Sequence, residues 1–420
     1  MKSAHQLRVC SSGMSRIFKP IVLTLLAVVV GSANVHADIV TDWNVKAAEI
    51  ASKLPGPPPG AVRVMANTQV AVYEAVNAIT KRHAPFRASI EAVPGASVDA
   101  AVAAATRGIL AKSVPMQLAA TEAAYQAALA LVPESLAKTD GIAVGEKAAA
   151  AVLVLRASDA TAFSIPDSYR PHTTAGNYVP TIIPVAQTVA LRKPWVMTSP
   201  QQFRPGPPPA LNSETWTRDF NEVKALGGAN STQRTKEQTD IARFWEATMP
   251  VIYWPIVRSV AAAPGHDVTH NARLLAAAGV AMDDSMIAIF DAKYTYNFWR
   301  PITAIRNGDI DGNDATARDA GWTPFIDTPM HPEYPCAHCI VSGSLSGLLE
   351  AEIGNGPTPL IATSSPTAAG ATRTWTRLSD LVMEVQLARI YDGVHFRTSG
   401  QVGTAMGKQI GELAAKAFFK

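Results

Sequence analysis

The chain has 420 residues, of which 48% are hydrophobic, and its 37 Lys and Arg residues stand against 34 Asp and Glu. Four of the cations precede residue 38, so the remainder carries 33 basic against 34 acidic residues. A charge balance near zero argues against nucleic acid and anionic membrane surfaces as partners. The length suffices for one large domain or two closely packed ones.

The first 37 residues have the pattern of a secretory signal. A basic stretch is followed by the apolar run PIVLTLLAVVVGSA at 20–33 and by small residues up to Ala37. An uncleaved N-terminal anchor is the alternative. Beyond this segment no apolar run reaches the roughly 20 residues of a membrane helix. We therefore expect cleavage before Asp38, export to the periplasm or the exterior, and no stable membrane insertion of the mature chain.

Apolar residues recur at helical spacing through most of the mature chain, whereas strand-like alternation is rare. No glycine-rich phosphate loop follows a strand pattern, and no internal repeat is visible. The pattern predicts an all-α protein. The clearest expected helices cover residues 61–80, 98–111, 116–132, 231–245, 272–300 and 407–419.

Proline residues divide the chain. The stretch GPPPG at 56–60 separates an N-terminal helix from the first long one. Residues 164–209 hold many prolines and little periodicity, which indicates a long irregular connection. We therefore expect an N-terminal helical region with this connection over 38–209, and a helical core that carries the chemistry over 210–420.

Two cations in the stretch DAKYTYNFWRPITAIRNGD, Lys293 and Arg300, are seven residues apart. On one α-helix this is almost two turns, so both side chains would leave the same face. Their aromatic neighbours argue against a solvated face, and a buried pair of like charges is costly without an anion between them. Two cations on an ordinary amphipathic helix are the alternative.

A second pair, Arg389 and His395, lies in LARIYDGVHFRTSG. Six residues on one helix would place the two side chains on different faces. Gly393 stands between them and is expected to end the helix. Both side chains could then point into one pocket, one from the helix end and the other from the next turn.

Three stretches together, K-x6-R-P at 293–301, P-C-A-H at 335–338 and R-x5-H at 389–395, resemble a known signature. It is that of the vanadium-dependent haloperoxidase and type 2 phosphatidic acid phosphatase superfamily, which runs K-x6-R-P, P-S-G-H and S-R-x5-H-x3-D. The resemblance to the exported bacterial haloperoxidase-like branch continues through VTDWN, VAVYEAVNAI, GNYVPT and HPEYP and covers nearly the whole mature chain. It implies a helical bundle with an N-terminal helical extension and a pocket for a tetrahedral oxyanion.

The resemblance implies vanadate as the cofactor, or phosphate in a phosphatase. Lys293, Arg300 and Arg389 would hold the oxygens of this anion, because guanidinium groups and an ammonium group suit oxyanions. Cys336 and Ala337 would complete the binding site from the second motif.

Two histidines carry the implied chemistry. His395 matches the histidine that bonds to vanadium, or attacks phosphorus in the phosphatases. His338 matches the acid/base histidine, which in a phosphatase would protonate the leaving group.

The chain departs from the signature at four positions. Cys336 stands in place of serine, Ala337 in place of glycine, Ala388 in place of serine, and Ser399 in place of the aspartate that would orient the motif-three histidine. A thiol is a poorer hydrogen-bond donor than a hydroxyl and is vulnerable to peroxide. The binding site stays plausible, and turnover is put in question.

Three functions remain open from the sequence. The first is a haloperoxidase-like enzyme that uses hydrogen peroxide to oxidise halide or an organic acceptor. The second is an acid phosphatase that cleaves a phosphate ester through a phosphohistidine, which the missing aspartate weakens. The third is a non-catalytic oxyanion-binding protein. The sequence leaves an oligomer open.

Cys336 and Cys339 are the only cysteines after residue 37. A thiol–disulfide catalyst would place this motif after a strand, and the surroundings here are helical. We expect a disulfide that pins His338 between its two ends. A free, acidic Cys336 thiol at a helix N-terminus is the alternative.

His266 and His270, at positions i and i+4, suggest a metal pair or a polar helix start. The glutamate of the zinc-protease motif is absent, and Pro264-Gly265 precedes the pair. These features favour the helix start. His331 could line the pocket or cap its loop.

Overall fold

The computed structural model describes residues 38–159, 172–180 and 182–419. The described chain from residue 38 onward forms one compact unit. The predicted signal peptide lies outside the described residues. Across these ranges, no helix combines the length and the apolar character needed to cross a membrane.

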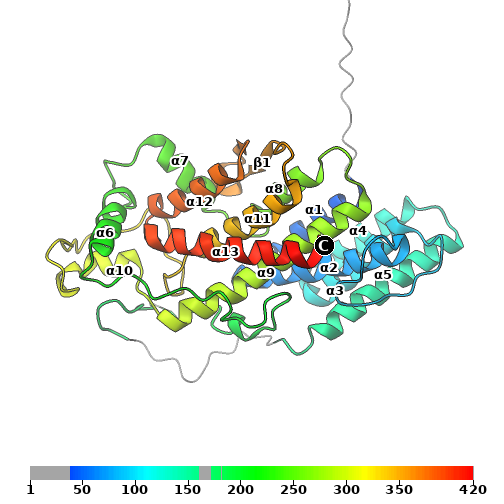
Figure 1. The fold of residues 1–420 in the computed structure, drawn as a ribbon, viewed down its shortest axis with the longest axis horizontal. Coiled ribbons are helices and arrows are strands. Elements are labelled where there is room, and N and C mark those ends of the chain that lie inside the picture. The colour runs from blue at the N-terminus through cyan, green and yellow to red at the C-terminus, as the bar shows by residue number, and fades with distance from the viewer. Residues whose placement is uncertain (1–37, 160–171, 181, 420) are drawn as a thin grey trace, which may run out of the picture. The chain divides into compact units, whose positions relative to one another are not determined.

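Thirteen α-helices account for most of the described residues, and the all-α prediction is confirmed (Figure 1). They are α1 (Ile39–Ala51), α2 (Pro59–Thr80), α3 (Val98–Ser113), α4 (Leu118–Ala130), α5 (Leu136–Leu155), α6 (Glu214–Leu226), α7 (Lys236–Trp245), α8 (Trp254–Ala261), α9 (Val268–Tyr296), α10 (Pro301–Arg306), α11 (Ala337–Ile353), α12 (Leu378–Tyr391) and α13 (Arg397–Phe418). Two short strands, β1 (Ile361–Ser364) and β2 (Thr372–Trp375), form an antiparallel hairpin.

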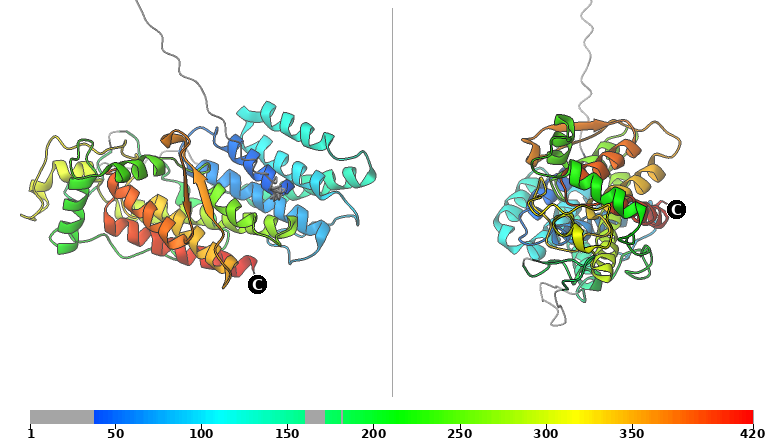
Figure 2. Two further views of the ribbon diagram at one scale, coloured as in Figure 1. Left: turned by 90° about the horizontal axis from the view of Figure 1, so that it is seen from above. Right: turned by 90° about the vertical axis from the view of Figure 1, so that its left-hand side faces the viewer.

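The N-terminal helices pack around α2, which is buried along most of its length and contains buried polar residues such as Arg63 and Glu74 as well as apolar ones. It contacts α3, α5 and α9. Ser97 and Ser135 cap α3 and α5, each accepting a hydrogen bond from a backbone N–H of the first turn. Figures 1 and 2 show these helices, in blue to cyan, gathered beside the first half of α9.

Helix α9 links this N-terminal group to the C-terminal helices, since it also packs against α11 and α13. Its N-cap is Asp267, whose carboxylate accepts from the N–H groups of Thr269 and His270. The predicted polar helix start is therefore confirmed. Midway along α9 the buried Asp284 accepts from three successive backbone N–H groups, 195–197, and so anchors the Pro-rich connection.

Helices α11 and α13 run parallel and touch along a row of glycines. Gly403, Gly407 and Gly411 of α13 face the backbone of α11, and Gly343 and Gly347 of α11 face that of α13. At each position a Cβ atom would collide with a carbonyl oxygen of the other helix, so only glycine permits this approach. We call this contact the glycine seam.

Several predicted helix boundaries are wrong. The last helix, expected from residue 407, begins already at Arg397, and the one expected from residue 272 begins at Val268. The helix expected over 231–245 begins only at Lys236, because Thr235 and Gln238 form a capping box there. The helix expected over 272–300 ends at Tyr296, because Asn297 adopts the left-handed conformation (φ 47°). The domain boundary at residue 209 stays a prediction, and α2 and α9 pack together across it.

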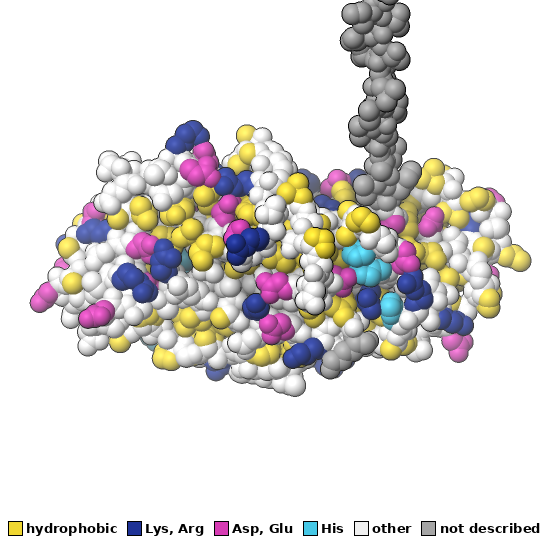
Figure 3. All heavy atoms as spheres, turned by 45° about the horizontal axis from the view of Figure 1, so that its top comes forward, with side chains coloured by type: hydrophobic (Ala, Val, Ile, Leu, Met, Phe, Trp, Pro, Cys, Tyr) yellow, Lys and Arg dark blue, Asp and Glu magenta, His cyan; other side chains and the backbone are white. Residues whose placement is uncertain are grey.

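The charged side chains on one face can be followed in Figure 3. Lys and Arg side chains are interspersed with Asp and Glu there, and no large area of one sign forms. Such a face does not produce a long-range field that would attract a polyanion.

Candidate functional site

Lys293 lies in the last turn of α9 and is completely buried. Its Nζ donates to the carbonyl oxygens of Pro332 (2.9 Å) and Glu333 (2.7 Å). Burial, then the nearby Arg300, lowers the pKa of Lys293 well below its usual range. The ammonium is thus tied to the loop that carries the HPEYP stretch.

Arg300 is not on the same helix as Lys293, so the expectation of one shared helix face is wrong. The left-handed Asn297 ends α9, and Arg300 is the extended N-cap of α10. Its guanidinium donates from Nε to the His331 carbonyl (2.9 Å) and from an Nη to the Val394 carbonyl (2.8 Å). Lys293 and Arg300 are still brought together, because both bind the loop at 331–333.

Arg389 and His395 converge as predicted. Helix α12 ends at Tyr391, Gly393 takes a positive φ of 80°, and the N–H of His395 returns to the carbonyl of Arg389 at 3.1 Å. The Arg389 guanidinium is only 2% exposed and pairs with the buried Asp392 carboxylate at 2.8 Å. The turn after α12 thus brings the backbones of Arg389 and His395 into direct contact.

Glu333 is the residue that the sequence reasoning missed. Its Oε1 lies 2.7 Å from His395 Nδ1 and accepts from the Phe396 N–H at 3.1 Å. Ser399, in the position of the signature's aspartate, is farther away, with Oγ 3.4 Å from Nδ1. The carboxylate that orients the imidazole therefore comes from the HPEYP loop, 62 residues earlier in the chain.

These contacts fix the tautomer of His395. An Nη of Arg300 lies 3.2 Å from His395 Nε2, and a guanidinium can only donate. Nε2 therefore carries the lone pair, and Nδ1 carries the hydrogen that Glu333 accepts. Burial, then the charges of Arg300 and Lys293, holds the pKa of His395 well below its usual range. The imidazole is neutral, and its Nε2 lone pair, which accepts from Arg300, is the one that could act as a ligand or nucleophile.

Glu333 titrates in an unusual range. Burial raises its pKa to about 7, although Lys293, Arg300, and hydrogen bonds from Phe396 and Ser399 oppose the rise. A buried carboxyl with this pKa changes its charge near neutrality.

The second motif forms the start of α11. Cys336 is its N-cap and is joined to Cys339 by a disulfide, with Cα atoms 5.3 Å apart, as expected. The oxidised sulfur has no S–H hydrogen to donate, so the Cys336 side chain cannot replace the signature's hydroxyl donor. Ala337 is the first residue of the helix, and its N–H has no partner within the helix.

His338 lies one residue farther and is partly buried. Its Nε2 is 3.3 Å from the Ala247 carbonyl. Burial, then the charge of Arg389, lowers the pKa of His338 well below its usual range. The positive charge of Lys293 contributes to this lowering as well.

The charges and donors of this cluster fit an oxyanion. Lys293, Arg300 and Arg389 are all at most 2% exposed, and Nε of Arg389 is a buried donor without a hydrogen-bond partner. Burial raises the pKa of Glu333 to about 7 and that of Asp392 to about 6, so of these two carboxyls only Asp392, paired with Arg389, is largely ionised at neutral pH. Burying one unpaired cation costs several kcal/mol. A bound anion would supply the missing negative charge.

Arg300 also lines a cavity of about 610 Å³, enclosed by residues within 178–179, 300–307 and 323–330. None of the other six predicted site residues lines this cavity. His331, which the sequence left undecided, contacts Arg300 through both its carbonyl and its Nδ1 (3.0 Å). The cavity therefore meets the cluster at Arg300.

Comparisons with known proteins agree with this geometry. Residues 273–420 match the family model described as the VCPO second helical-bundle domain. The chain is 28% identical over 179 residues to the vanadium chloroperoxidase of Curvularia inaequalis. This match covers 35% of the chain but only 29% of that protein.

Solved structures share the fold. A bacterial vanadium-dependent iodoperoxidase matches 90% of this chain and 95% of its own, with a TM-score of 0.75 and 22% identity. The apo form of a bacterial vanadium-dependent chloroperoxidase matches 89% and 97%, with a TM-score of 0.74 and 18% identity. The family model and the sequence match thus relate part of the chain to vanadium chloroperoxidases, and the described chain shares the fold of the bacterial vanadium-dependent haloperoxidases.

Proposed function

We propose that this protein is a vanadate-dependent haloperoxidase-like enzyme that uses hydrogen peroxide to oxidise halide or a related nucleophile. The observation that carries the proposal is the imidazole of His395. Glu333 holds its Nδ1–H, and its Nε2 lone pair faces a cluster of three buried cations. A neutral imidazole nitrogen is the form that binds a metal centre.

Each residue of the cluster would have its own role in binding vanadate. Lys293, Arg300 and Arg389 would hold the vanadate oxygens, assisted by the N–H of Ala337, and His395 Nε2 would be the ligand to vanadium. Bound vanadate supplies a Lewis-acidic centre that activates hydrogen peroxide toward a nucleophile.

His338 is the proposed acid/base residue. Its lowered pKa keeps the ring neutral at neutral pH, so it can accept a proton from a group beside the anion. The relatives named above are a chloroperoxidase and an iodoperoxidase, which supports small-molecule substrates for this chain as well. The basic and apolar pattern of residues 1–37 supports export.

A titration with orthovanadate tests the proposal. Purified protein in phosphate-free buffer is assayed for peroxide-dependent oxidation of iodide, bromide and chloride. We expect activity that saturates with vanadate and is suppressed competitively by phosphate. Saturable vanadate binding without oxidation of any of the three halides would contradict it.

Acid phosphatase activity is the second candidate, and Glu333 favours it. The missing aspartate at Ser399 weakens this function in the sequence, yet Glu333 orients the His395 ring in its place. A nucleophilic Nε2 would then form a phosphohistidine. Hydrolysis of p-nitrophenyl phosphate without vanadate, abolished in His395→Ala, would favour the phosphatase.

A non-catalytic oxyanion-binding protein is the remaining alternative. The oxidised Cys336 and the alanine at 388 motivate it, because both remove a hydroxyl that the signature contains. Anion binding with no turnover in the halide and the phosphatase assays would support this alternative.

A further inference from the structure

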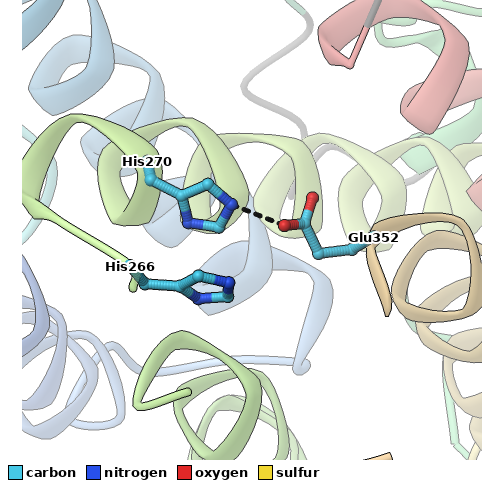
Figure 4. A group of neighbouring side chains, drawn as sticks. All are labelled: His266, His270 and Glu352. Atoms are coloured by element: carbon cyan, nitrogen blue, oxygen red, sulfur yellow. Dashed lines mark hydrogen bonds and ion pairs between the residues drawn. The ribbon is translucent and has the colours of Figure 1, made fainter. Parts of the chain in front are cut away.

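A second cluster of ligating side chains lies at the opposite end of α9 from Lys293. It consists of His266, which precedes the helix, His270 in its first turn, and Glu352 near the end of α11. One ligand atom from each of the three lies within 4.8 Å of the others. All three side chains are partly buried, and both imidazoles face the Glu352 carboxylate in Figure 4.

We propose that His266, His270 and Glu352 form a binding site for a divalent transition-metal ion of the zinc type. Two imidazoles and one carboxylate are a borderline donor set, which suits Zn²⁺ and Co²⁺ rather than Ca²⁺ or Mg²⁺ with their preference for six or more oxygens. Three protein ligands leave a fourth tetrahedral position to water.

The arrangement needs little adjustment to accept the ion. His270 Nε2 lies 2.5 Å from Glu352 Oε1, and two ligands on a tetrahedral zinc ion stand roughly 3.4 Å apart. The His266 and His270 rings are already close, with centroids 3.8 Å apart and planes inclined by 33°. Small side-chain rotations would place the three ligand atoms around one ion.

The hydrogen bond between His270 and Glu352 does not include His266, whose ring interacts with the backbone of Val260 and Ala261. The Nδ1 atoms of both histidines are buried without a hydrogen-bond partner among the described residues. Two imidazoles so close together cannot both be protonated at low cost, because their charges would repel. An ion bound by a nitrogen at the edge of each ring would account for the close approach of His266 to His270.

The site would brace the two helices that also build the oxyanion cluster. His270 and Lys293 lie near the two ends of α9, and His338 and Glu352 lie near the two ends of α11. An ion bound at the far ends of both helices would fix their relative position without touching the anion. The site is thus independent of the proposed function.

Zinc and cobalt titrations test the inference on chelator-treated protein in vanadate-free and phosphate-free buffer. We expect about one Zn²⁺ per chain by calorimetry, a rise in Tm, and a visible Co²⁺ band typical of four-coordination. In His266→Ala the hydrogen bond between His270 and Glu352 should be kept, yet Zn²⁺ affinity should fall by more than the about 10–100-fold that outer-shell changes cause.

The controls distinguish loss of the metal site from loss of folding, and specific Zn²⁺ binding from nonspecific binding. His172→Ala removes an exposed histidine outside the cluster and should bind Zn²⁺ like the parent. His266→Gln keeps the bulk of the side chain and should lose the ion as well, with helical circular dichroism unchanged in the presence of chelator. Equal Zn²⁺ binding by the parent and either His266 variant, or no saturable binding by the parent, would overturn the proposal.

Discussion

The two ends of α9 carry opposite chemistry. At its C-terminal end Lys293 is completely buried, and its ammonium donates hydrogen bonds to two backbone carbonyl oxygens. Two further buried cations belong to the same cluster. At its N-terminal end His270 is partly exposed and pairs directly with the Glu352 carboxylate. The first end has an excess of positive charge without a solvent to screen it, and the second end is close to neutral.

The difference shows how local charge selects a ligand. Buried cations with unused donors require an anion, because desolvation makes an uncompensated charge costly. Two imidazoles beside a carboxylate offer nitrogen and oxygen lone pairs, which suit a cation. One helix can therefore serve two ligands of opposite sign, provided that its two ends stay far apart.

Removal of His395 gives the largest expected effect. His395→Ala deletes the nitrogen ligand, so vanadate affinity should fall by more than the about 10–100-fold typical of an outer-shell change. His338→Ala should leave binding intact and reduce turnover by about 10²–10⁴-fold. Vanadate binding by calorimetry and halide oxidation check the two variants. Equal loss of binding in both would abolish the distinction between ligand and acid/base residue.

Removal of Glu333 tests the orientation of the ring. Glu333→Ala leaves Nδ1 without its acceptor, and vanadate affinity should fall about 10–100-fold. Glu333→Gln keeps an oxygen that can accept from Nδ1 and from the Phe396 N–H, so it should lose less. Ser399→Ala should lose less, because Ser399 lies farther from Nδ1 and contributes through its hydrogen bond to Glu333. An unchanged affinity in folded Glu333→Ala would show that the carboxylate does not position His395.

The pH dependence of stability provides a separate test of Glu333. The unfolded carboxyl titrates near 4.5 and the folded one near 7. Between these values the folded state binds more protons, so the stability linked to Glu333 is present at low pH and is lost as the pH rises through 7. The Tm of the parent minus that of Glu333→Gln should therefore decrease from pH 5 to pH 8 in phosphate-free buffer. A flat or rising difference would contradict a raised pKa.

The disulfide gives the smallest expected effect. Its loop is short, so Cys336→Ser/Cys339→Ala should lower the free energy of unfolding by about 2 kcal/mol or less in urea denaturation. Serine at 336 restores the hydroxyl of the signature and can cap α11, so vanadate should bind at least as tightly as in the parent. A clear loss of affinity would give the oxidised pair a role at the anion. Thiol counting on the denatured, unreduced parent should detect no free thiol.

Much of the fold follows from local pattern. Apolar periodicity predicts α2 and α3 because long amphipathic or apolar helices repeat one signal many times. The predicted start at residue 231 is wrong although the sequence contains a readable capping box at Thr235. The predicted end at Arg300 is wrong because one residue, Asn297, leaves the helical conformation, and periodicity does not register a single residue.

The site is less readable because its key contact is distant in the chain. The signature identifies the cations and His395, and Gly393 predicts the turn between them. Glu333 belongs to no periodic pattern, and its contact with His395 depends on how the loop at 331–335 packs on the start of α13. One sequence signal could have identified Glu333. It is a carboxylate within the proline-containing HPEYP stretch of a chain whose third motif has Ser399 instead of the aspartate.

The glycine seam bears on how such a protein can change during evolution. Gly403 and Gly407 allow the first half of α13 to pack directly against α11. His395 directly precedes the start of α13, and His338 lies at the start of α11. Any larger residue in the seam would push the helices apart and separate the two histidines. New substrate preferences would therefore arise by exchange of residues in the loops around the Arg300 cavity, whereas the helix pair would be inherited almost without alteration.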